Sequence, residues 1–276
     1  MPSFSALADD PCVLRARAQP VRGGVVHLAQ TTGAAPGTAI ASGGYGACNL
    51  GDHVGDVPEG VAVRREGLRA RLGVSAIGWL EQVHGTAVQE VREPLPPTVA
   101  TADAQWTRTP SVALAIMTAD CLPILAWSLE DRWVAAIHGG WRGLVGGVIT
   151  ATLRSLAEAG SNVHSPWQAW LGPAISAPCY EVDAPVHDAV QQRLQRHLPR
   201  ASMKAVLLPG RAPDRWQLDL VALARAELGV LGCAAVWGGT ECTASQPHYY
   251  SYRQANRVGP QPCGRQASLV WRAPEG

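Results

Sequence analysis

Short apolar runs separated by polar or glycine-rich segments dominate the pattern of this chain. Runs of five or six residues rich in Val, Ile, Leu, Ala and Trp have the length of buried strands rather than of helices. They predict strands at residues 24–29, 76–80, 86–91, 112–117, 123–127, 132–137, 167–172, 234–239 and 267–271. Between the first two lies a long loop, residues 31–55, which is dense in Gly, Ala and Asn.

Other segments repeat their apolar residues at the spacing of a helix. One helix is predicted from Pro58 to Leu72, with Pro58 suited to its first turn and Gly73 to its C-terminal cap. Further helices are predicted at residues 143–160, 186–198 and 218–228. Helices mixed with strands, some adjacent in sequence, indicate an α/β fold (mixed α+β) with a mixed sheet. No repeat, linker or compositional break divides the chain, so we expect one domain, residues 1–276.

Charge and cysteine content narrow the class of protein. The 276 residues carry a formal net charge of +1, so we expect no nucleic-acid partner. No apolar run is long enough to span a bilayer, and the N-terminal residues lack the pattern of a signal peptide. The seven cysteines include no C-x-x-C pair, which argues against a disulfide framework. We therefore expect a cytoplasmic protein with no membrane partner; the sequence makes no prediction of its oligomeric state.

The common catalytic templates are absent. The single lysine, in SMKAV, is not part of a P-loop, and the chain contains no G-x-G-x-x-G and no G-x-S-x-G. It also lacks H-E-x-x-H and the H-x-E with P-C-x-x-C pattern of zinc nucleobase deaminases. The chemistry must therefore be sought in residues that lie apart in the sequence.

Reactive side chains recur where predicted strands end. His84 follows the apolar run AIGWL by a few residues, and Asp120 and Cys121 follow VALAIM in the same way. In AAIHGGWRG, His138 ends a strand and two glycines remove the next side chains. Strand ends are rigid supports at the edge of a sheet, which suits a site of fixed geometry. Two imidazoles and a thiolate form a ligand set for zinc or copper.

The residues alone leave open a purely structural role for the two histidines and the cysteine. A single histidine at a strand end is more often a hydrogen-bonded structural residue, and a single buried cysteine more often packs in a core. The three residues are also too far apart to form a local metal-binding motif. If they do bind one ion, three protein ligands leave a coordination position open, as in catalytic zinc sites, where bound water can become a nucleophile near neutral pH.

A set of longer motifs resembles a known family. They are NLGDHVGD, WLEQVHGTAV, ADAQWT, TADCLPIL, AAIHGGWRGLVGGVI, LGPAIS with CYEV, WQLDLVALARAEL, CT and YSYR, between residues 49 and 253. In this order they resemble the laccase-domain family, also known as purine nucleoside phosphorylases of the bacterial polyphenol-oxidase type or as peptidoglycan-editing factors. The resemblance implies one mixed α/β domain with mixed β-sheets packed between helical layers.

The resemblance also implies a function and a metal. Family members are described as zinc enzymes that cleave adenosine, inosine and methylthioadenosine with phosphate and that deaminate adenosine. The implied zinc ligands are His84, Cys121 and His138, which would also be catalytic, with copper as a second candidate cofactor. The expected partners are a purine nucleoside and phosphate.

Other residues receive expected roles around this centre. Arg142 is the best candidate to hold phosphate, because a guanidinium binds such an anion through paired hydrogen bonds; an arginine paired with a surface carboxylate is the alternative. Asp120 is a candidate catalytic residue that orients a ligand or carries a proton, although capping or turn formation is the simpler explanation. On the resemblance alone, Asn49, Gln82 and Arg253 are candidate substrate-binding residues.

Alternative functions and some departures from the family pattern remain. A copper polyphenol oxidase is less favoured, because the eight histidines include no H-x-H pair. Hydrolytic editing of a peptidoglycan precursor and a non-catalytic metal-binding module stay open. Arg64, Glu81 and Gln254 depart from the residues usual in the family, and because we expect their loops to border the pocket, the substrate preference stays open.

Overall fold

Two large β-sheets form the centre of the protein. The computed structural model describes residues 4–7, 10–16, 18–40, 44–198, 203–257 and 259–274. The first sheet contains, in spatial order, β1 (Phe4–Leu7), β2 (Asp10–Ala16), β4 (Gly24–Thr31), β18 (Gln266–Arg272), β10 (Val112–Thr118) and β5 (Ala76–Gly78), with β3 (Gln19–Val21) paired to β4. Its pairings are antiparallel except that of β5 with β10.

The second sheet has the same mixed character. It contains, in spatial order, β17 (Ala235–Gly238), β13 (Trp167–Leu171), β11 (Leu122–Ser128), β12 (Val134–Gly139), β9 (Ala104–Thr107) and β7 (Val88–Glu90). Parallel pairs at both edges flank an antiparallel centre. Two smaller sheets are β14 (Glu181–Val182), β16 (Trp216–Leu218) and β15 (Leu207–Pro209), and β6 (Leu80–Glu81) with β8 (Ala100–Thr101).

The two large sheets pack face to face, and the alternation of side chains along each strand shows how. Leu114 and Ile116 of β10 lie in one buried cluster with Leu125 and Trp127 of β11, between the sheets. Ala115, which points to the opposite face of β10, belongs to a different cluster on the α1 side. Successive residues of a strand point to opposite faces, so both faces of each sheet are buried.

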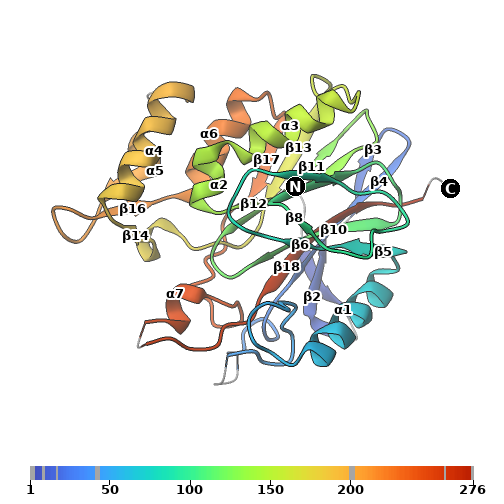
Figure 1. The fold of residues 1–276 in the computed structure, drawn as a ribbon, viewed down its shortest axis with the longest axis horizontal. Coiled ribbons are helices and arrows are strands. Elements are labelled where there is room, and N and C mark those ends of the chain that lie inside the picture. The colour runs from blue at the N-terminus through green and yellow to red at the C-terminus, as the bar shows by residue number, and fades with distance from the viewer. Residues whose placement is uncertain are drawn as a thin grey trace.

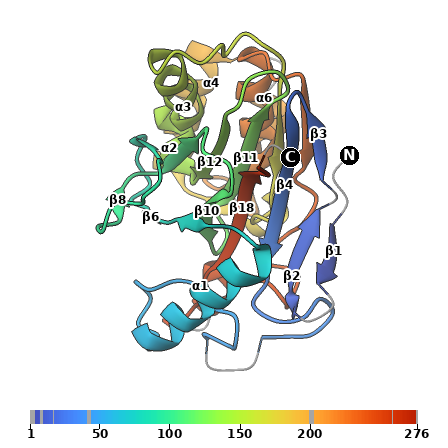
Figure 2. The same ribbon diagram turned by 90° about the vertical axis from the view of Figure 1, so that its right-hand side faces the viewer.

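Helices cover the outer faces. Figures 1 and 2 show α1 (Pro58–Leu72) apart from α2 (Trp141–Gly146), α3 (Val148–Glu158), α4 (Ala184–His197) and α6 (Leu220–Val230). The largest apolar cluster joins α3, α4 and α6 to the second sheet, and a separate cluster joins α1 to the first. The shorter helices are α5 (Met203–Val206), α7 (Tyr252–Ala255) and a 3₁₀ turn, η1 (Ala177–Cys179). The predicted fold, mixed sheets between helical layers, is confirmed.

Most predicted elements are present, but two of them are interrupted. The strand predicted at 76–80 is divided between β5 and β6, which belong to different sheets. Helix α1 has the predicted bounds, and its cap residue Gly73 adopts the left-handed conformation. The continuous helix predicted at 143–160 is wrong: Gly147 has a φ of 88° and separates α2 from α3. The apolar spacing continues across this residue, so the break left no trace in the pattern.

Within the described segments, no helix combines the length and apolarity needed to cross a membrane. The assignment of the whole chain to one domain stays a prediction.

The break at Gly147 leads to a test of stability. A Cβ atom there would lie 3.1 Å from Nη2 of Arg193, and a non-glycine residue at this φ is strained. We expect Gly147→Ala to lower the free energy of unfolding by about 1–2 kcal/mol, measured by urea denaturation. The control is Gly229→Ala in α6, where a Cβ meets nothing within 4 Å and no stability should be lost. Equal stability of Gly147→Ala and the unaltered protein would contradict this account.

Candidate metal centre and active site

The three residues expected to bind a metal lie together. His84 comes from the loop between β6 and β7, Cys121 from the turn between β10 and β11, and His138 from β12. Their potential ligand atoms all lie within 4.8 Å of one another. Sγ of Cys121 is 3.6 Å from Nε2 of His84, and the two imidazole ring centroids are 4.8 Å apart. Among the described residues, this is the one group of three or more His, Cys, Asp or Glu side chains placed to hold an ion.

Strand register and a glycine allow this approach. In the antiparallel β11–β12 pair, Leu122 faces Gly139, which brings Cys121 beside Gly140. A Cβ atom on Gly140 would lie 2.7 Å from Cδ2 of His84 and 3.3 Å from Sγ of Cys121. A side chain at this position would therefore separate the two, and the glycine after the strand is explained by the cluster itself.

A buried carboxylate, Asp103, holds both histidines. It is fully buried just before β9, and its Oδ1 accepts hydrogen bonds from Nδ1 of His138 and from the backbone N–H of His84, each at 2.8 Å. Its Oδ2 accepts from the backbone N–H of Gly85 at 2.6 Å. Because a carboxylate only accepts, Nδ1 of His138 carries a hydrogen, and Nε2 is the ring nitrogen left to bind a metal once it gives up its own proton. His84 has a φ of 62°, a costly conformation that these bonds stabilise.

Asp103 is not among the residues that the sequence pattern indicated. It lies in the quoted motif ADAQWT, but nothing in the order of residues shows that this carboxylate faces two distant imidazoles. Asp103 is thus a positioning residue that only the fold reveals.

Electrostatics make the cluster a good receptor for a cation. Burial would raise the pKa of Cys121, but the charge of His138 and hydrogen bonds from both imidazoles outweigh it and lower the pKa to about 6. Burial would lower the pKa of His138, but the Cys121 thiolate and Asp103 raise it to about 9. A thiolate and an imidazolium therefore face each other, and a divalent ion can replace the imidazolium proton. The donor set fits zinc or copper.

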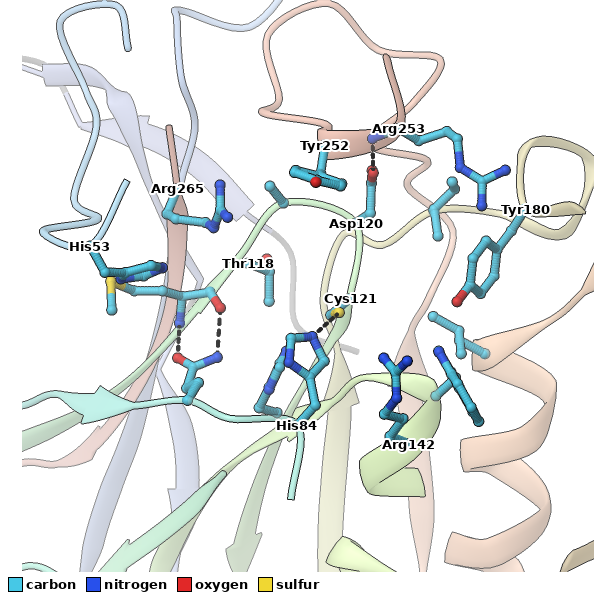
Figure 3. Close-up of a pocket in the computed structure, with 17 residues that line it drawn as sticks. His53, His84, Thr118, Asp120, Cys121, Arg142, Tyr180, Tyr252, Arg253 and Arg265 are labelled. Carbon is cyan, nitrogen blue, oxygen red and sulfur yellow. Dashed lines mark hydrogen bonds between the residues drawn. The ribbon is translucent and has the colours of Figure 1, made fainter. Parts of the chain in front are cut away.

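The cluster lies in the wall of a cavity of about 400 Å³. Figure 3 shows His84 and Cys121 between Arg142 and Tyr180 on one side and His53 and Arg265 on the other. The cavity is within the size range of small-molecule sites. Besides the cluster, it is lined by His53, Gln82, Met117, Thr118, Ala119, Asp120, Trp141, Arg142, Ile175, Tyr180, Leu220, Tyr252, Arg253 and Arg265.

Arg142 lies in the cavity wall without an acidic partner. Its guanidinium lies 4.6 Å from the ring centroid of Trp141. Within the described ranges, no carboxylate lies within ion-pair distance of Arg142, so the alternative of a paired surface arginine is not observed. Arg142 lies in the first turn of α2, a helix of only six residues that is too short to offer an anion site at its N-terminus. The side chain itself is what remains for an anion.

Asp120 and Arg253 are linked to each other. Asp120 lies at a φ of 96°, and its two oxygens accept hydrogen bonds from Oγ1 of Thr243 at 2.6 Å and from the backbone N–H of Arg253 at 2.7 Å. The guanidinium of Arg253 donates to the Glu181 carbonyl and lies 5.2 Å from the ring centroid of Tyr180. Asp120 thereby fixes the start of α7 at the cavity.

Gln82 and Asn49 use their amides within the protein. Gln82 lines the cavity, but its Nε2 donates to the Met117 carbonyl and its Oε1 accepts from the Met117 N–H. Asn49 is fully buried and does not line the cavity; its Oδ1 accepts from the backbone N–H of Gly51 and of Arg265. This geometry favours positioning roles over the direct substrate contacts expected from the sequence.

The three departures from the family pattern lie outside the cavity lining. Arg64 pairs with Asp56 and donates to the Asn49 carbonyl, and Glu81 accepts from the Thr101 hydroxyl. Gln254 lines neighbouring depressions rather than the cavity with the cluster. The loops of Glu81 and Gln254 do reach the cavity through their chain neighbours Gln82 and Arg253, although the three side chains themselves do not line it.

The Asp103 bonds lead to a prediction for metal affinity. We expect Asp103→Asn to weaken zinc binding by about 10–100-fold, because the amide cannot hold both histidines as the carboxylate does. Competition with a chromophoric chelator measures this without any turnover assay. Asp214→Asn, at an exposed position, is the control. Unchanged zinc affinity in a folded Asp103→Asn protein would show that the clamp does not position the ligands.

Known proteins share both the sequence and the fold. A family model described as multi-copper polyphenol oxidoreductase laccase matches residues 32–273. A Pseudomonas aeruginosa protein named purine nucleoside phosphorylase is 42% identical over 228 residues, 82% of this chain and 86% of that protein. The Escherichia coli protein named purine nucleoside phosphorylase YfiH is 36% identical over 229 residues, 82% of this chain and 87% of that protein.

Solved structures agree with the sequence matches. A Neisseria meningitidis protein aligns with a TM-score of 0.79 and 35% identity, covering 95% of this chain and all of that chain (100%). YlmD from Geobacillus stearothermophilus also aligns with a TM-score of 0.79, at 26% identity, covering 99% of this chain and 100% of its own. On these matches, the chain belongs to the family described as multi-copper polyphenol oxidoreductase laccase, whose curated relatives are named purine nucleoside phosphorylases.

Proposed function

We propose that this chain is a zinc-dependent purine nucleoside phosphorylase. The observation that carries the proposal is a His–Cys–His cluster in the same cavity as Arg142, a guanidinium with no carboxylate partner among the described residues. The names of the relatives support a nucleoside and phosphate as substrates. The proposed substrates are adenosine, inosine and methylthioadenosine.

His84, Cys121 and His138 would hold the metal. A bound zinc ion would supply a Lewis acid with one coordination position left for a reactant. The chain's own contribution is to fix these donors through Asp103 and to keep Cys121 deprotonated. Copper is a second candidate for the same donors.

Arg142 and Arg253 would bind phosphate. Both line the cavity beside Tyr180: the guanidinium of Arg253 lies 5.2 Å from the Tyr180 ring centroid, and Figure 3 shows Arg142 on the same side of the cluster. A phosphate dianion between two arginines is bound by charge-assisted hydrogen bonds from planar donors. Asp120 would contribute by holding Arg253 through its backbone N–H.

Deamination of adenosine is a second reaction proposed for the same cavity, and the geometry favours it less. It requires a group that moves protons at the purine ring. Asp120 is the one carboxylate in the described lining, and both its oxygens already accept hydrogen bonds from Thr243 and Arg253. This engagement suits positioning rather than proton transfer.

Two further activities are separated by experiment. Laccase chemistry uses several coppers, whereas the described residues form one candidate ion site. Hydrolytic editing of a peptidoglycan precursor would use the same cavity on an amide. Metal analysis of the purified protein, and incubation with adenosine with and without phosphate, distinguish these cases by the products: ribose-1-phosphate and adenine, inosine, or neither.

The thiolate of Cys121 provides a direct test of the metal site. We expect Cys121→Ser to reduce both bound zinc and phosphorolysis at least about 100-fold, because a hydroxyl is a far weaker ligand than a thiolate. Cys48→Ala is the control: burial raises the pKa of Cys48 to about 12, so this thiol stays protonated. Normal phosphorolysis by a folded Cys121→Ser protein would refute the proposed function of the cluster.

The guanidinium of Arg142 can be tested separately as the phosphate-binding group. We expect Arg142→Gln to raise the KM for phosphate by about 10–100-fold, the range for losing charged hydrogen bonds, while the KM for inosine changes little. Arg154→Gln, on the exposed side of α3, should behave as the unaltered protein. Initial rates at varied phosphate measure the effect, and an unchanged phosphate KM would remove Arg142 from the proposed site.

A further inference from the structure

A second group of side chains faces the cavity opposite Arg142. In Figure 3, Arg265 and His53 lie on the far side of His84 and Cys121 from Arg142. The Arg265 side of the cavity is defined here by His53, Met117, Thr118, Tyr252 and Arg265. The phosphate site proposed above makes no use of these residues.

Arg265 is held in place but not neutralised. Its backbone N–H donates to Oδ1 of Asn49, and its Nη1 donates to the carbonyls of Cys263 and Gly264 at 2.8 and 3.0 Å. No carboxylate of the described chain lies within ion-pair distance of it. The guanidinium lines the cavity with its positive charge and its remaining N–H groups available.

The neighbours of Arg265 are polar but uncharged. Burial and the charge of Arg265 lower the pKa of His53 despite the adjacent Asp52, so the imidazole is neutral at pH 7. Thr118 is almost completely buried in the cavity wall, and its hydroxyl oxygen has no hydrogen-bond partner. A buried hydroxyl without a partner is rare and often indicates a ligand or water that supplies one.

Apolar surfaces complete this side. Met117 contributes a polarisable thioether side chain to the cavity wall. Tyr252, a residue of α7 that is 57% exposed, presents its ring to the cavity. Flat or soft apolar faces with a polar edge match a purine ring. A phosphate dianion is matched better by the other side, where Arg142 and Arg253 offer two positive charges.

We propose that the Arg265 side binds the purine base and that the Arg265 guanidinium stabilises the negative charge gained by the departing base. The inference rests on the phosphorylase function proposed above. A phosphate oxygen forms a bond to C1′ while the C1′–N9 bond breaks, and the electron pair of that bond passes to N9. Phosphate releases its proton to solvent and the purine takes one up, so the charges balance. With phosphate and base held on opposite sides, the reaction inverts C1′.

Leaving-group dependence tests this assignment. Arg265→Gln should lower kcat for inosine about 100-fold, the range for removing one electrostatic stabiliser, and leave the KM for phosphate unchanged. With 7-methylguanosine, whose base is already cationic and departs neutral, the same variant should lose little activity. Arg265→Lys, which keeps the charge, should recover part of the inosine rate. Equal slowing of both nucleosides, or a raised phosphate KM, would overturn the assignment.

A binding measurement and a second variant keep the test independent of turnover. By calorimetry, hypoxanthine should bind Arg265→Gln at least about 10-fold more weakly than the unaltered protein. Thr118→Val, which removes no bond within the protein, should raise the KM for inosine but not that for phosphate. Unchanged hypoxanthine affinity in Arg265→Gln overturns this inference but leaves the proposed phosphorylase function standing. If the unaltered protein releases no base from any nucleoside, the proposed function fails and the inference fails with it.

Discussion

The Asp103 carboxylate is the constraint on which the candidate site depends. A fully buried charge is stable only when it is well hydrogen-bonded, and Asp103 accepts bonds from the His138 ring and from the backbone at His84 and Gly85. Burial would raise the pKa of this carboxyl, but these bonds lower it, so the charge is retained. Asp103 therefore orients the His138 imidazole directly and the His84 imidazole through the His84 backbone.

The sheets supply the rigidity that this arrangement requires. His138 is the penultimate residue of β12, and its backbone N–H donates to the Asp103 carbonyl at 2.7 Å. Cys121 lies in the turn that joins β10 of one sheet to β11 of the other. Both sheets are buried on both faces, so these strand ends cannot shift independently. Two of the candidate metal donors, Cys121 and His138, are consequently fixed by the packing of the two sheets.

Local patterns predicted much of the fold and the three donors, but not the contacts between distant residues. Helix α1 and strands β10 to β12 were predictable because their apolar spacing agrees with their burial. Placement at strand ends indicated His84, Cys121 and His138. Asp103, in contrast, acts through residues far away in sequence, and no periodicity reports this. The break at Gly147 depends on a left-handed backbone conformation that the apolar pattern does not record.

Asn49 and Gln82 belong to two of the recognisable motifs, and their amides form hydrogen bonds within the protein. Asn49 connects the backbone of Gly51 to that of Arg265, and Gln82 is bonded to both backbone groups of Met117. Asn49 thus positions Arg265, and Gln82 positions Met117; both of these neighbours line the cavity. Arginines without carboxylate partners in the described chain then stand on both sides of the donor cluster, an arrangement that favours a reaction in which one anion attacks and another departs.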